Sequence, residues 1–191
     1  MRRFDGEGVA VVLGAYLDGP YKFVLILHIF CAIVGFGAVF LNGVYGAQIK
    51  KQRGPGALAI YEANFKVSKI GEYFIYAVFV LGLALVGMSS FNGHSLFKFS
   101  QTWVWLAVVL YIVGIGLSHG VLWPAVKRMG VLMREMTAAG PPPAGAAGPP
   151  PQAAEMEALG KRIGATGATL NVLLVVILFL MVWKPGGPAG L

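Results

Sequence analysis

The chain alternates long apolar runs with polar stretches, and the runs are longer than those of ordinary core helices. They cover about Tyr21–Ile49, Val67–Phe91, Gln101–Val126 and Ala165–Trp183. Each run reaches or approaches the ~20 residues that a helix needs to cross about 30 Å of hydrocarbon. Backbone groups in a bilayer must be hydrogen-bonded within their own segment, so a helix is the only open-chain form for such a run. The pattern predicts an all-α, polytopic membrane four-helix bundle.

Composition agrees with this class. Of the 191 residues, 57% are hydrophobic and only 12% are charged, which is too little charge for an ordinary soluble domain. The formal net charge of +7 does not indicate a nucleic-acid-binding protein, because the basic residues lie in loops that flank the apolar runs. We therefore expect a lipid bilayer, and no nucleic acid, among the partners of the chain.

The distribution of lysine and arginine predicts the orientation of the bundle. Ten basic residues lie in the loops between spans one and two and between spans three and four, against five on the other side. Because cytoplasmic loops carry the excess of positive charge, both basic loops are expected in the cytoplasm. Both termini are then outside a bacterial cytoplasmic membrane. The ten residues are Lys50, Lys51, Arg53, Lys66, Lys69, Lys127, Arg128, Arg134, Lys161 and Arg162.

The loop between spans three and four forms a cytoplasmic connector. It begins with an amphipathic stretch, Val126–Met136, which we expect to lie along the membrane interface. Pro-Pro-Pro at 141–143 and again at 149–151, separated by Ala and Gly, favours an extended spacer. The predicted parts of the chain are an outer N-terminal segment (1–20), spans one to three (21–127), the amphipathic and Pro/Gly-rich connector (128–164), and span four with an outer tail (165–191).

Each span carries a polar residue that hydrocarbon cannot solvate: Asn42, Glu72, His119 and Asn171. At 1.5 Å per residue, each lies roughly 8–10 Å from the cytoplasmic end of its span. The four residues therefore fall in one inner-leaflet layer, in which Glu72 and His119 are the expected hydrogen-bonded pair. The layer either holds the helices together through polar contacts or forms a proton-handling or ligand-binding site.

The first span also carries a stripe of small and polar residues at spacings of four and three. Small residues on one helix face admit a neighbouring helix or a flat ligand such as a porphyrin. A neutral imidazole that faces a glycine-lined slot is what an axial haem ligand requires. His28 is therefore a candidate iron ligand with Gly35 in the slot, and helix packing alone is the alternative. The stripe consists of His28, Ala32, Gly35, Val39, Asn42 and Gly46.

His28 and His119 cannot ligate one haem within a monomer. Spans one and three are parallel, and the two residues differ in depth by roughly 16 Å. Each would need a second ligand of another type. Alternatively, a two-fold homodimer would place two copies of His28 on either face of a shared haem.

A copper site is an alternative in the outer leaflet. His28, Cys31, Met88 and Met181 offer imidazole and soft sulfur, which suit Cu(I). They come from three different spans and lack tight metal-ligand spacing. The sequence contains no nucleophile–base pair, phosphate loop, acidic dyad or dinucleotide fingerprint, so independent catalytic activity is not expected.

The stretch LILHIFCAIVGFGAVFLNG in span one, together with Trp103, the late His119 of span three and the ending LMVWKPG at 180–186, resembles a group of small bacterial four-helix membrane proteins. The group includes uncharacterised integral-membrane families, the membrane part of copper-resistance protein D and the HemJ-type protoporphyrinogen oxidases. The likeness covers about Tyr21 to Gly186.

The resemblance implies haem b bound through the first-helix histidine, here His28, with His119 as the late histidine of the third helix. The oxidase-like relatives also carry a lysine within span three. No lysine lies between Trp103 and His119, so the resemblance does not extend to porphyrinogen oxidation.

The sequence thus predicts a b-type haem-binding electron-transfer protein or accessory subunit of a respiratory-type membrane complex. Its expected partners are other membrane subunits or a second copy of the chain, and a quinone. A cofactor-free structural subunit and a copper-handling membrane protein are the alternatives.

Overall fold

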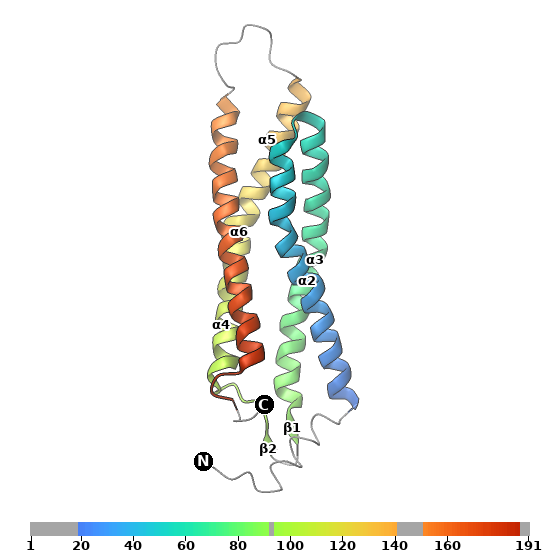
Figure 1. The fold of residues 1–191 in the computed structure, drawn as a ribbon, viewed down its shortest axis with the longest axis vertical. Helices are drawn as coiled ribbons and strands as arrows, with labels where there is room; N and C mark the ends of the chain where they lie inside the picture. The colour runs from blue at the N-terminus through green and yellow to red at the C-terminus, as the bar shows by residue number, and fades with distance from the viewer. Residues whose placement is uncertain (1–18, 92–93, 141–150, 188–191) are drawn as a thin grey trace.

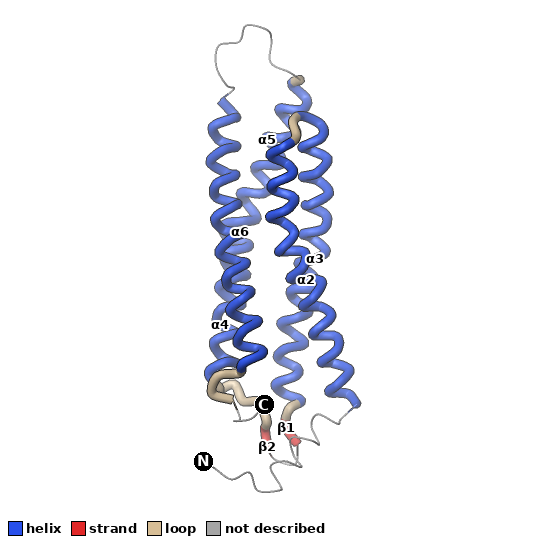
Figure 2. The backbone as a smooth tube through the Cα atoms, in the orientation of Figure 1, coloured by secondary structure: helices blue, strands red, loops and turns tan. Residues whose placement is uncertain are grey.

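Long antiparallel helices stand side by side in the molecule (Figure 1). The computed structural model describes residues 19–91, 94–140 and 151–187. Figure 2 shows how little of this described backbone lies outside helices. The elements are α2 (Gly19–Lys51), α3 (Gly54–Met88), β1 (Ser90–Phe91), β2 (His94–Ser95), α4 (Thr102–Leu117), the π-helical turn η1 (Ser118–Leu122), α5 (Trp123–Ala139) and α6 (Pro151–Trp183).

Four of the described helices are long and apolar enough to cross a membrane, and α4, η1 and α5 together form the third of them. The prediction of an all-α membrane bundle with four spans is therefore confirmed. The strands β1 and β2 contribute two residues each, pair antiparallel, and join α3 to α4. The orientation of the termini across the membrane stays a prediction.

The helices extend well beyond the predicted spans at the end that carries the basic loops. α3 begins at Gly54, α5 continues to Ala139, and α6 begins at Pro151, inside the second proline triplet. α5 continues the third run directly after η1 (Figure 1), and the location of Val126–Met136 at the membrane interface stays a prediction. The rest of the predicted spacer, 141–150, lies outside the described residues.

A small apolar core explains why this end stays helical. Tyr61 of α3 packs against Met133 of α5, and its hydroxyl donates a 2.8 Å hydrogen bond to the carbonyl oxygen of Val126. The apolar residues of α5 in this core therefore pack on protein. Around this core, Arg128 forms two hydrogen bonds with Glu155 of α6, at 2.7 and 2.9 Å. Such exposed ion pairs contribute little stability, so the apolar contacts hold the extension together.

The α2 stripe packs on α3. Gly35 faces the backbone of Ile75: a Cβ at position 35 would lie 3.1 Å from the Ile75 nitrogen. Further along, a Cβ at Gly71 would lie only 2.5 Å from the Cβ of Ala38. The small residues thus let the two backbones approach each other closely. The sequence allowed either a neighbouring helix or a flat ligand such as a porphyrin beside this stripe. The structure shows a neighbouring helix, α3, at Gly35.

We expect Gly71→Ala to destabilise the protein by about 1–3 kcal/mol, as is usual when a methyl group is forced into a well-packed contact. Unfolding in mixed micelles with increasing SDS measures the effect. Gly43→Ala is the matched control, because a Cβ there meets no atom within 4 Å. Equal stability of the two variants would contradict the close α2–α3 contact.

Candidate functional site

His119 lies in a π-helical turn, η1, within the third membrane-spanning helix. In η1 the Trp123 N–H donates to the Ser118 carbonyl oxygen, five residues back, instead of four. Pro124 gives a physical reason. Proline has no N–H, and in an α-helix its ring would press on the carbonyl group of Gly120. The wider turn relieves this conflict, and π-turns of this kind are frequent at functional sites.

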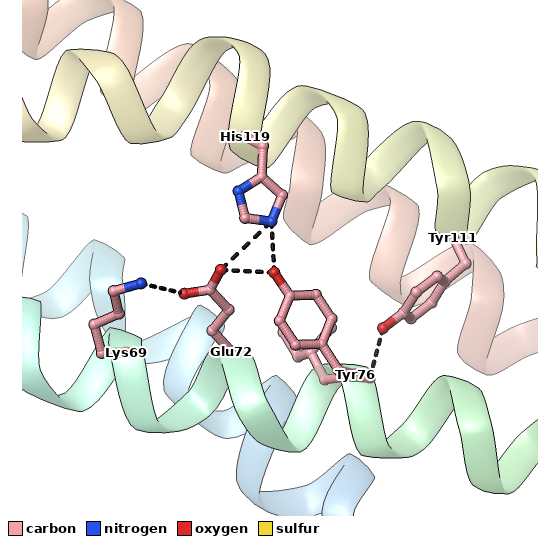
Figure 3. A network of polar contacts seen from close by, with 6 residues as sticks. Lys69, Glu72, Tyr76, Tyr111 and His119 are labelled. Carbon is pink, nitrogen blue, oxygen red and sulfur yellow. Dashed lines mark hydrogen bonds and ion pairs between the residues drawn. The ribbon is translucent and has the colours of Figure 1, made fainter.

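His119 belongs to a polar network with three residues of α3 (Figure 3). The Tyr76 hydroxyl lies 2.7 Å from Glu72 Oε1 and 2.6 Å from His119 Nε2. Glu72 Oε1 lies 3.4 Å from His119 Nε2, and Lys69 Nζ lies 3.0 Å from Glu72 Oε2. The spacing of 69, 72 and 76 puts the three α3 residues on one helix face.

Tyr111 of α4 fixes the two sides of the network relative to each other. Its hydroxyl donates to the Ile75 carbonyl oxygen on α3. Its ring stacks on Phe79, with ring centroids 4.6 Å apart. The rings of Tyr76 and His119 are also nearly parallel, with centroids 6.2 Å apart. Aromatic and polar side chains thus bridge α3 to the α4–η1 run.

The network is only partly covered. The side chains of His119 and Glu72 are 44% and 23% exposed. Both residues lie within helices that can span a membrane, where hydrocarbon cannot replace hydrogen bonds to water. Polar residues in such positions face a partner, a ligand or a water-filled space. We therefore expect a polar group or water next to the exposed atoms of His119 and Glu72.

Of the four polar residues that the sequence placed in one layer, the structure brings Glu72 and His119 together. Asn42 instead accepts a 2.8 Å hydrogen bond from Ser68 within the α2–α3 pair. The Oδ1 atom of Asn171 is buried, and no described residue donates to it. The layer therefore divides among separate helix contacts instead of forming one cluster.

Tyr76 is the residue of the network that the sequence analysis missed. It looks like one more aromatic residue in an apolar run. The signal was its spacing: four residues after Glu72, its hydroxyl reaches the carboxylate on the same helix face.

His28 lies between α2 and α3, apart from this network. Its Nδ1 atom is 3.0 Å from the Val78 carbonyl oxygen, and a Cβ at Gly82 would lie 3.2 Å from its Cε1 atom. Gly35, the predicted slot residue, is buried against α3. A haem held by His28 would therefore have to lie outside the α2–α3 contact.

The proposed copper ligands do not form an evident site. Cys31 is a buried free thiol on α2, whereas Met88 and Met181 pack against the apolar cluster at the β1–β2 end of the bundle. Among the described residues, no group of three or more His, Cys, Asp and Glu side chains is arranged to hold a metal ion.

Comparison with known proteins gives one match. The model of a family described as a predicted integral membrane protein (DUF2269) matches residues 22–185, which include nearly all of the four long helices. No curated protein and no solved structure matches the chain. The likeness to copper-resistance protein D and to HemJ-type oxidases stays a prediction.

The contact between Tyr76 and His119 can be measured with a double-mutant cycle of Tyr76→Phe and His119→Ala. We expect a coupling free energy of about 0.6–1.7 kcal/mol, the range found for hydrogen bonds between membrane helices. Unfolding in SDS-containing micelles provides the measurement. Tyr73→Phe is the control, because the Tyr73 side chain lies on the exposed face of α3. A coupling of zero would contradict the bridging position of the Tyr76 hydroxyl.

Proposed function

Since the chain belongs to the DUF2269 family of predicted integral membrane proteins, we propose that it is a proton-handling accessory subunit of a larger membrane assembly. Glu72, Tyr76 and His119 carry the proton. One observation supports this function above all: the Tyr76 hydroxyl lies within hydrogen-bonding distance of both the carboxylate and the imidazole.

The hydroxyl of Tyr76 has a single proton, so it can donate to only one of its two neighbours at a time. With Glu72 ionised, it donates to Glu72 Oε1 and accepts from a protonated His119 Nε2. When the imidazolium gives its Nε2 proton to the Tyr76 oxygen and Tyr76 gives its own to Glu72, one proton moves from His119 to Glu72.

Lys69 sets the resting charge of this relay. Its ammonium group pairs with Glu72 Oε2 at 3.0 Å, which favours the ionised carboxylate. Lys69 is also the member of the network nearest to the basic end of α3. The relay thus joins His119, through Tyr76, to a charged pair nearer the basic end of α3.

The partial exposure of His119 supports the role of an accessory subunit. An imidazole that is 44% exposed on a membrane-spanning surface is unfavourable against lipid tails. A neighbouring subunit with polar groups would cover it and exchange the proton. The lipid-soluble quinone that the sequence analysis listed is a small-molecule alternative for the same position.

Haem b binding through His28 is a second candidate function. The Val78 carbonyl oxygen can only accept, so the Nδ1 atom of His28 must carry the proton. The Nε2 lone pair is then available, as in histidines whose ring orientation is fixed by a backbone carbonyl. A haem would add electron transfer to the accessory role. The packed stripe around Gly35 weighs against a porphyrin between α2 and α3.

Infrared difference spectra recorded as the pH changes test the relay in the purified protein. Because coupled groups titrate in shared macroscopic steps, we expect bands of carboxylate, tyrosine and imidazole to change in the same pH steps. Tyr76→Phe should separate the carboxylate and imidazole midpoints, whereas Tyr73→Phe should not. Independent midpoints in the unmodified protein would exclude the relay.

Optical spectroscopy tests the second candidate. If His28 ligates haem, the protein reconstituted with haem shows a Soret band that His28→Ala removes. His119→Ala should retain the band, because His119 belongs to the separate network on α3 and η1. A wild-type protein without a Soret band would end the haem hypothesis and leave the relay untouched.

A further inference from the structure

Two lysines meet at one tryptophan where α3 faces the start of α5. The Nζ atom of Lys69 lies 4.1 Å from the centre of the Trp123 ring, and the Nζ atom of Lys127 lies 4.9 Å from it. Lys69 belongs to α3, whereas Trp123 and Lys127 belong to α5. We call these three residues the lysine–tryptophan cluster.

The indole ring of the cluster is held in place by α3. Trp123 stacks on Phe65, with ring centroids 5.2 Å apart and an angle of 20° between the planes. The two ammonium groups therefore gather around a fixed aromatic platform. Each gains a favourable cation–π contact, worth about 0.5–1 kcal/mol at an exposed site.

The positive charge of the cluster is only partly balanced. Lys69 pairs with Glu72, but Lys127 is exposed, and its one described interaction is the contact with Trp123. Both ammonium groups lie around the same ring, and the single carboxylate of Glu72 cannot neutralise both. An anion that accepts hydrogen bonds from both lysines would remove this imbalance.

The position of the cluster along the bundle identifies the anion. It lies where the apolar part of the helices gives way to the basic, ion-paired extension, close to Arg128. Tryptophan and lysine at this level of a membrane protein contact lipid head groups. Basic sites between membrane helices attract anionic lipids of the facing leaflet.

We propose that the lysine–tryptophan cluster binds the phosphate of an anionic phospholipid. The ammonium groups of Lys69 and Lys127 donate to the phosphate oxygens, and the Trp123 ring, stacked on Phe65, holds the two lysine side chains at the site. The lipid binds between α3 and α5. It shares Lys69 with the proposed relay, so the test changes Lys127, which the relay does not use.

Native mass spectrometry of the full chain, released from micelles that contain phosphatidylglycerol and phosphatidylcholine, tests this site. We expect one tightly retained phosphatidylglycerol in the wild type. Lys127→Gln should lower its affinity about tenfold, more than the roughly fivefold effect of one lysine acting only through surface charge. Lys127 is exposed, so this change should leave the fold intact.

Lys66→Gln is the matched control. It removes the same charge from the same end of α3, at an exposed residue outside the cluster. We expect no more than the roughly fivefold loss of surface charge alone for this variant, because Lys66 lies outside the cluster. Equal losses in both variants, or no preference for phosphatidylglycerol in the wild type, would overturn the proposal. Displacement of the lipid by millimolar inorganic phosphate would show a free-anion site and would also overturn it.

Discussion

Hydrocarbon offers no hydrogen bonds, and this constraint decides where the polar groups of the chain lie. The spans are helical, so their backbone groups bond mostly within their own segment, as a bilayer requires. Polar side chains then have to find partners on neighbouring helices. Asn42 is hydrogen-bonded to Ser68, His28 to the Val78 carbonyl oxygen, and Tyr111 to the Ile75 carbonyl oxygen. Each such contact ties one helix to another.

The bundle consists of a tight pair and a looser set. α2 and α3 approach each other through Gly35 and Gly71, so their interface leaves little room. Between α3 and the α4–η1 run, the contacts are aromatic and hydrogen-bonded, through Tyr76 and Tyr111. Polar bridges of this kind gain less than close backbone packing does, and they expose part of their atoms. The polar network of Lys69, Glu72, Tyr76 and His119 lies on this looser side.

The polar network adjoins the basic end of α3 and α5. Lys69 contacts both Glu72 and the Trp123 ring, so it connects the polar network to the α5 side. The helical extension beyond it, built around Tyr61 and Met133, holds α3 and α5 at a fixed spacing. A rigid extension of this kind keeps His119 within reach of Tyr76, because η1 lies directly before α5.

The sequence alone determined the class of the protein, the number of spans and the common depth of Glu72 and His119. Length and hydropathy are sufficient for the first two, because a bilayer permits only one kind of open-chain span. Depth along each helix, counted at a fixed rise per residue, was sufficient for the third. The role of Tyr76, the π-turn at Ser118–Leu122 and the continuation of α5 were decided by the tertiary structure. Depth does not give the rotation of a helix about its axis. Rotation decides which partner a side chain meets, and it depends on how neighbouring helices pack and on how Pro124 alters its own helix.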